Sequence, residues 1–127
     1  MAIRLNHTIV YSNDKAAGAA FLVGLFELRP PSPFGPFLDV ALGNGVTLAF
    51  MDAGEMDVQP QHYAFLVSDE EFDRIYAAIV ARGLPHWDGP HKATVGINHN
   101  NGGRGVYFDD PSGHLLEIIT TPYGVPR

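Results

Sequence analysis

The sequence contains no cysteine, which excludes disulfides and thiolate metal ligands within this chain. Positive charge is also scarce, since 8 Lys and Arg residues stand against 14 Asp and Glu, for a formal net charge of −6. We therefore expect neither nucleic acid nor a membrane surface among its partners, because both favour basic proteins. The longest apolar run, residues 16–26, is interrupted by glycine and is too short to span a membrane.

Apolar residues, by contrast, are present in the usual proportion, 46% of a chain of 127 residues. This length suits one domain whose core needs no crosslinks. Arg4, Asn6 and His7 interrupt the N-terminal segment, so it does not resemble a signal peptide. The absence of cysteine fits a reducing compartment. We predict a single domain over residues 1–127, located in the cytoplasm.

Two segments follow the same plan, with His7 and Asp14 in the first matching His62 and Asp69 in the second, at an offset of 55 residues. Each begins with a short β-rich stretch that predicts a strand and continues into a predicted helix. In the first helix the expected buried face is Ala17, Ala20, Phe21, Leu25 and Leu28. In the second it is Phe72, Ile75, Tyr76, Ile79 and Val80. A period near 50 residues indicates a duplicated unit.

Local signals mark where these elements begin and turn. Ser68 followed by Glu71 predicts a capping box at the start of the second helix. Glycines at 45 and 113 predict hairpin turns near the end of each segment. The two glycines are 68 residues apart, so the second unit holds about thirteen extra residues, which we assign to the polar stretch 89–103. We predict an α+β fold with a first unit over 1–53 and a second over 61–122.

Three residues form a candidate metal site. Glu117 lies inside the apolar stretch Leu115–Ile119, where a carboxylate is costly unless it is paired or binds a metal. His7 and His62 occupy equivalent positions in the two units. Two imidazoles and one carboxylate form a facial set of ligands for a divalent metal. Taken singly, each histidine could have a structural role and Glu117 could form an ion pair. The combination of the three residues favours metal binding.

The segment 103–118 closely resembles the C-terminal signature of the vicinal oxygen chelate superfamily, which includes glyoxalase I, bleomycin resistance proteins, extradiol dioxygenases and fosfomycin resistance proteins. Each of the two units begins with a segment that resembles one of the superfamily's two histidine motifs. These segments are Asn6-His7-Thr8 and Gln61-His62-Tyr63. This resemblance covers nearly the whole chain. It implies two βαβββ units that form a cupped mixed sheet around one metal, usually in a homodimer, with His7, His62 and Glu117 as ligands.

The resemblance also suggests roles for other residues. Glyoxalase I-like members have a fourth ligand where the 68-residue offset places Ala49, which cannot bind a metal; this argues against a lactoylglutathione lyase. Tyr107 matches a tyrosine of the fosfomycin branch, and His99 is a second candidate catalytic residue. The candidate substrate-binding residues are Lys92, Arg104 and Tyr123.

The implied function is that of a metal-dependent enzyme, of dioxygenase, lyase or transferase type. Its small substrate would chelate the metal through neighbouring oxygens. Fe, Mn, Ni, Zn and Mg all remain possible, because such sites do not select a metal by affinity alone. The alternative is a metal-free drug-binding protein of the bleomycin resistance type, for which the acidic charge would suit a cationic ligand.

Overall fold

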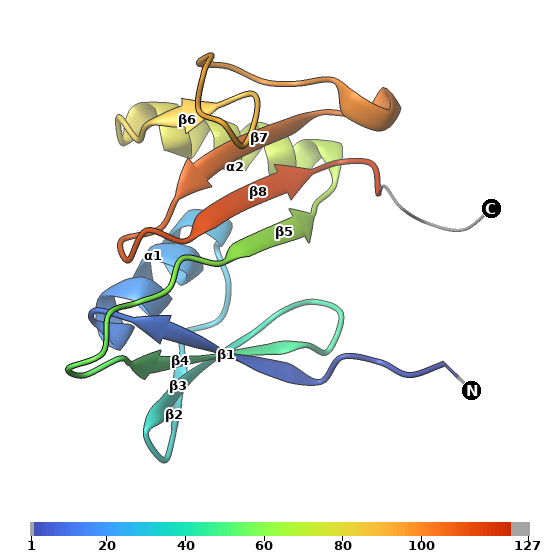
Figure 1. Ribbon diagram of the computed structural model, residues 1–127. Helices are drawn as coiled ribbons and strands as arrows, with labels where there is room; N and C mark the ends of the chain where they lie inside the picture. Colours follow the sequence, from blue (N-terminus) through green and yellow to red (C-terminus); the bar gives the residue numbers. More distant parts are fainter. Residues whose placement is uncertain (1, 123–127) are drawn as a thin grey trace. The chain divides into compact units, whose positions relative to one another are not determined.

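The computed structural model describes residues 2–122 of the chain (Figure 1). It divides into two compact units, unit 1 over Met1–Gln59 and unit 2 over Pro60–Arg127. Tyr123, a candidate substrate-binding residue, lies outside the described residues. Within residues 2–122, no helix combines the length and apolar character needed to cross a membrane.

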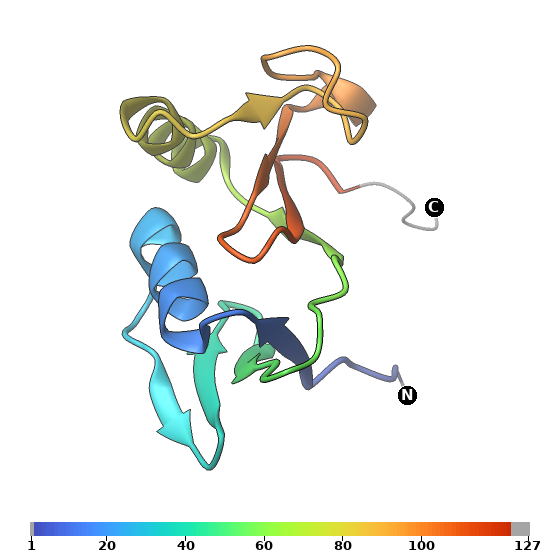
Figure 2. The same cartoon turned by 60° about the vertical axis from the view of Figure 1, so that its left-hand side comes forward.

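Unit 1 is one mixed sheet with one helix. Its elements in chain order are β1 (His7–Ser12), α1 (Lys15–Phe26), β2 (Ser32–Phe34), β3 (Phe37–Ala41) and β4 (Thr47–Asp52). The strand order is β1-β4-β3-β2, with β1 parallel to β4 and the other pairs antiparallel (Figure 2). The parallel pair is possible because α1 provides the crossover between β1 and the rest of the sheet.

Helix α1 begins after its N-cap Asp14, whose side chain accepts hydrogen bonds from the amides of Ala16 and Ala17. Its predicted buried face was wrong in detail: Ala17 and Ala20 are exposed. The buried residues are Gly18, Ala19, Leu22, Leu25 and Phe26. The helix is apolar nearly all round, so its periodicity could not identify the face that packs on the sheet.

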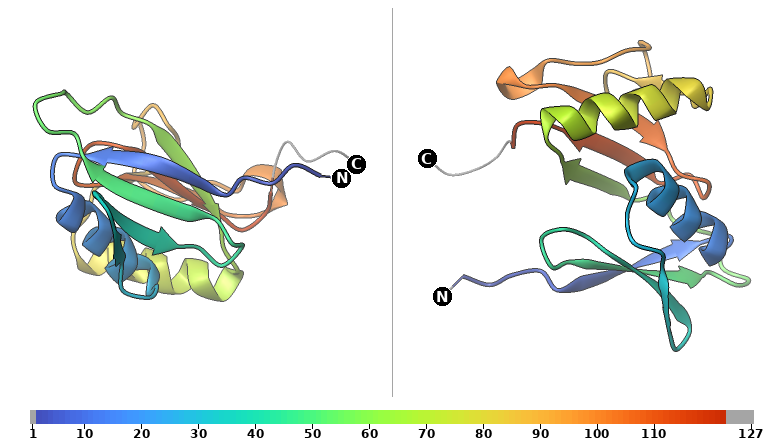
Figure 3. Two further views of the ribbon diagram at one scale, coloured as in Figure 1. Left: turned by 90° about the horizontal axis from the view of Figure 1, so that it is seen from below. Right: turned by 180° about the vertical axis from the view of Figure 1, so that it is seen from behind.

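Unit 2 repeats this plan. Its elements are β5 (His62–Leu66), α2 (Asp69–Ala81), β6 (His86–Trp87), the 3₁₀ turn η1 (Asn100–Gly102), β7 (Gly105–Asp109) and β8 (Leu115–Ile119). The strand order β5-β8-β7-β6 matches that of unit 1, and α2 lies over one face of the sheet (Figure 3). The buried residues of α2 are Phe72, Ile75 and Ile79, whereas Val80 is 53% exposed.

The strand registers confirm both sequence offsets. His7 pairs with Thr47 in unit 1, and His62 pairs with Leu115 in unit 2, so the histidines differ by 55 residues and their partners by 68. The extra residues lie between β6 and β7, where unit 1 has only the tight turn at residues 35–36. The structure thereby confirms an α+β fold of two tandem βαβββ units.

The predicted capping box of α2 is present. The Glu71 amide donates to Ser68 Oγ at 3.1 Å, and the Ser68 amide donates to the Glu71 carboxylate at 2.8 Å. The hydrogen bond from the Ser68 amide to the carboxylate, reinforced by the Ser68 side chain, lowers the pKa of Glu71. Since a lowered carboxyl pKa contributes stability above the unfolded value, this contribution is lost as the pH falls through the folded pKa of Glu71.

Replacing Ser68 with alanine is expected to lower the free energy of unfolding by about 1 kcal/mol, because the Glu71 amide at the helix start loses its acceptor. Urea denaturation followed by circular dichroism measures the change. Ser32→Ala, at an exposed serine in β2, is the control and should change stability little. Equal stabilities for the two variants would contradict an energetic role for the cap.

Candidate metal centre

Glu117 stands in the middle of β8 with only 2% of its surface exposed. The flanking apolar residues of β8 pack into the core, so burial of the carboxylate follows from its position in the strand. Strand β5 runs parallel to β8 and pairs Ala64 with Glu117, which places His62 two residues away on the same face. His62 Nε2 lies 3.1 Å from Glu117 Oε1. The structure thus brings two of the three predicted ligands together.

The other ring nitrogen determines which tautomer His62 adopts. His62 Nδ1 lies 2.9 Å from the Leu115 carbonyl oxygen, which can only accept a hydrogen bond, so Nδ1 must carry the proton. In the neutral imidazole Nε2 then has a bare lone pair directed at the Glu117 carboxylate. Two acceptors at this distance require a cation or an additional proton between them.

A divalent metal ion satisfies this requirement. Imidazole nitrogens and carboxylate oxygens bind such ions at about 2.1 Å. Two ligands at right angles on one ion are therefore about 3 Å apart. The observed Nε2–Oε1 separation of 3.1 Å agrees with this value. The hydrogen bond from Nδ1 to a backbone carbonyl is also the usual second interaction of metal-binding histidines. The residues present therefore fit a divalent metal.

Tyr107 lies beside this pair. It is on β7 opposite Glu117, and its ring stacks on the His62 ring with centroids 5.8 Å apart and planes inclined by 22°. Only 9% of Tyr107 is exposed. The structure thus places this candidate catalytic residue next to the candidate ligands, where it holds the His62 ring in orientation.

A cavity of about 440 Å³ opens over the same face of unit 2. Three asparagines from the long β6–β7 connection line it on one side, and strands β7 and β8 line the other. The lining residues are Asn98, Asn100, Asn101, Arg104, Tyr107, Glu117, Ile119 and Thr121. The volume lies within the usual range for small-molecule sites, about 300–1,000 Å³.

Arg104 lines this cavity, but its guanidinium is held by acidic groups. It donates to Asp73 Oδ1 at 2.7 Å and to Asp69 Oδ1 at 3.0 Å, and these bonds raise the pKa of Arg104. Its Cζ atom also lies 4.5 Å from the centroid of the Phe72 ring. Arg104 therefore anchors the long connection to α2, and two carboxylates offset its charge.

Two other predicted residues of unit 2, Lys92 and His99, are absent from the lining of this cavity. Lys92 donates to Asp109 Oδ2 at 2.7 Å and lies 4.8 Å from the Trp87 ring centroid. His99 is exposed at the start of η1 and is absent from the cavity lining. These contacts do not indicate a function for either residue. The substrate-binding role of Lys92 and the catalytic role of His99 therefore stay predictions.

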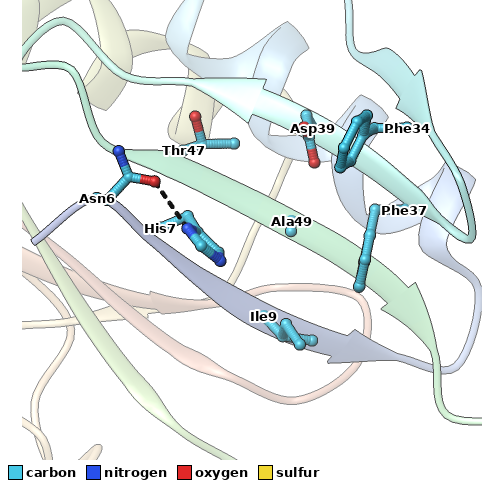
Figure 4. Close-up of a pocket in the computed structure, with 8 residues that line it drawn as sticks. All are labelled: Asn6, His7, Ile9, Phe34, Phe37, Asp39, Thr47 and Ala49. Carbon is cyan, nitrogen blue, oxygen red and sulfur yellow. Dashed lines mark hydrogen bonds between the residues drawn. The ribbon is translucent and has the colours of Figure 1, made fainter.

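His7, the third predicted ligand, begins β1 of unit 1 and is exposed. Its Nδ1 atom lies 2.8 Å from Asn6 Oδ1, an acceptor, so Nε2 again has the bare lone pair (Figure 4). Within residues 2–122 the structure shows no group of three or more His, Cys, Asp or Glu side chains placed to hold a metal. Unit 2 brings together His62 and Glu117, and His7 belongs to unit 1.

A second cavity, of about 270 Å³, lies on the sheet of unit 1 around His7 (Figure 4). Its lining residues are Asn6, His7, Ile9, Phe34, Phe37, Asp39, Thr47 and Ala49. Sequence reasoning did not identify Asp39 as a residue of a candidate site. A signal for Asp39 existed, because it interrupts an apolar strand as Glu117 does.

Comparison with known proteins agrees with this architecture. The sequence profile of the Glyoxalase/Bleomycin resistance protein/Dioxygenase superfamily matches residues 4–118. A metallothiol transferase, FosB of Lysinibacillus sphaericus (strain C3-41), is 28% identical over 123 residues, which cover 91% of this chain and 81% of FosB.

Two solved structures are more similar. Oxidase ChaP-H1 is 54% identical with a TM-score of 0.94, over 98% of this chain and 100% of that one. Oxidase ChaP-H2 is 49% identical with a TM-score of 0.93, over 98% of both chains. The chain therefore belongs to the Glyoxalase/Bleomycin resistance protein/Dioxygenase superfamily, as its sequence motifs indicated.

Proposed function

We propose that this protein is a metal-dependent oxidase that acts on a small substrate with two neighbouring oxygens. His62 and Glu117 of unit 2 hold the divalent ion, together with His7 of unit 1. The observation that carries the proposal is the contact between His62 Nε2 and Glu117 Oε1, two acceptors 3.1 Å apart, in which the carboxylate is buried and the imidazole is partly exposed. The two oxidases described above, each about half identical to this chain, favour oxidation over the other reactions of the superfamily.

An ion held by two neutral imidazoles and one carboxylate keeps a net positive charge; it supplies Lewis-acid chemistry and, as Fe(II), redox chemistry with dioxygen. The protein's own groups prepare the site for this ion. The Leu115 carbonyl fixes the His62 tautomer, and the Tyr107 ring restricts rotation of the imidazole. Because Glu117 is buried, water screens its charge less than it would screen a carboxylate on the surface.

The cavity of unit 2 further defines the proposed substrate. Its cation, Arg104, is already paired with Asp69 and Asp73, so it offers little net positive charge to a phosphonate or phosphate. Three asparagine side chains, which donate and accept hydrogen bonds, also line it. This combination suits a neutral molecule rich in hydroxyl and carbonyl groups.

Metal analysis of the purified protein is the direct test. We expect one equivalent of a divalent ion per site, loss of thermal stability on chelation, and recovery when the ion is restored. Oxygen uptake measured with the Fe(II)-loaded protein and catechol-type probes then tests oxidation. A protein that binds none of Fe, Mn, Ni, Zn or Mg would contradict the proposal and favour the alternative of a metal-free binding protein.

We also propose that the protein works as a homodimer in the cytoplasm. Mixing His7→Ala protein with Glu117→Gln protein tests whether His7 serves the site of its own chain or that of a second copy. Metal binding restored by mixing would identify a site shared between copies. A site within one chain predicts no recovery.

A further inference from the structure

The cavity of unit 1 contains a carboxylate that the proposed metal centre does not use. Asp39 is in β3 and is partly buried. Among the described residues its side chain makes no hydrogen bond or ion pair. A carboxylate at the wall of a cavity that has no protein donor is available to accept a hydrogen bond from a ligand.

The duplication shows how this carboxylate comes to face a cavity. Asp39 pairs with Ala49, just as Tyr107 pairs with Glu117 in unit 2. Unit 1 therefore has a methyl group where unit 2 has its buried glutamate, and a carboxylate where unit 2 has its tyrosine. The small side chain of Ala49 leaves space above the centre of the sheet, and Asp39 borders that space.

The other walls of this cavity are apolar and partly aromatic. Phe34 is 70% exposed and Ile9 is 37% exposed, although both are large apolar residues. Phe37 is opposite Phe34 in the β2–β3 hairpin, on the same side of the sheet as Asp39 and His7 (Figure 4). Phenylalanine rings gathered around a hollow favour a flat aromatic ligand, since rings pack in stacked or edge-to-face pairs.

We propose that this cavity, the Asp39 pocket, binds an aromatic ring that carries a hydroxyl group, and that the hydroxyl donates a hydrogen bond to Asp39. This hydroxyl is separate from the oxygens that would chelate the metal. The inference rests on the proposed function only in treating this ring as part of the substrate, because His7 lines the same pocket. The volume of about 270 Å³ suits a small ring system.

Asp39 is thereby a specificity-determining residue. A ligand whose hydroxyl is methylated retains the ring contacts but leaves the carboxylate without its donor. Sites built to bond a hydroxyl discriminate strongly against analogues that lack it, because the buried acceptor stays unpaired. We expect discrimination by about tenfold or more between a phenol and its methyl ether.

The test is a titration of the ¹⁵N-labelled protein as purified, followed by NMR, with 2-naphthol and with 2-methoxynaphthalene. We expect 2-naphthol to shift the amides of Asp39, Thr47 and Ala49 and to bind about tenfold or more tightly than the ether. Asp39→Ala should remove this preference while the ether binds as before. Asp39→Asn, which keeps the shape and an acceptor oxygen, should reduce it only in part. Asp57→Asn, at an exposed aspartate of unit 1, is the control.

Equal affinities for the two probes in the wild type, or a preference that survives in Asp39→Ala, would overturn the proposal. So would shifts confined to unit 2, around Tyr107 and Thr121. Repeating the titration after chelation separates this proposal from the metal centre. Phenol selectivity in a protein that takes up no metal would refute the proposed oxidase alone. Metal uptake without selectivity would refute the Asp39 pocket alone.

Discussion

Glu117→Gln is expected to abolish metal binding while leaving the metal-free protein folded. Gln has the shape of Glu, and its amide can donate to the bare Nε2 atom of His62, so the local contact survives. A neutral amide is a poor ligand compared with a carboxylate. Because changes to second-sphere partners already weaken metal affinity by about 10–100-fold, loss of this direct ligand should cost more than about 100-fold. Metal titration and oxygen uptake should fall together.

Thermal melts provide the matching measurement. An ion present at about 100 times its dissociation constant stabilises the folded state by about 2.7 kcal/mol, and this increment should vanish in Glu117→Gln and in His62→Ala. Glu70→Gln and His91→Ala are the controls, because they change exposed residues of the same types in unit 2. Both variants should retain the stabilisation by the metal. A wild-type metal response in Glu117→Gln would show that Glu117 is a structural residue.

Phe72→Ala is expected to lower the free energy of unfolding by about 3–5 kcal/mol, a large share of the about 5–15 kcal/mol typical of a domain. The Phe72 side chain is on the buried face of α2 and is fully inaccessible to water. Its removal leaves a cavity and also removes the ring that lies against the Arg104 guanidinium. Because Arg104 anchors the long connection, we expect the NMR signals of residues 98–101 to broaden as well.

Val80→Ala is the control for this change, since Val80 is on the same helix but half of its surface is exposed. Val80→Ala should lower the free energy of unfolding far less, because the Val80 side chain buries little apolar surface. Denaturation in urea measures both variants. Similar losses in the two would show that α2 packs through a different face from the one formed by Phe72, Ile75 and Ile79.

Prediction from sequence succeeded where the signal is local. Ser68 and Glu71 form the capping box within one helical turn. Gly45 and Gly113 have backbone φ angles of 80° and 89°, which glycine adopts without strain, so both hairpin turns could be assigned from the sequence. It failed for the buried face of α1, because a helix that is apolar nearly all round gives no preferred side.

The candidate site shows the same division. Glu117 and Asp39 each interrupt an apolar strand, a signal that sequence alone provides, although only Glu117 was recognised. Arg104, which the sequence suggested as a substrate-binding residue, shows where local patterns end. Its partners Asp69 and Asp73 are more than 30 residues away along the chain, and no local pattern indicates that pairing.

The sequence by itself determined the duplication, the two βαβββ units and the residue types available to bind a metal, because periodicity, caps and turns act over a few residues. Only the tertiary structure decided which of these residues meet. The parallel register of β5 on β8 brings His62 to Glu117 across 55 residues of chain, and the pairing of β3 with β4 places Asp39 beside Ala49. Such long-range registers depend on the packing of whole strands and helices, so the chemistry of each cavity emerges only once the sheets have formed.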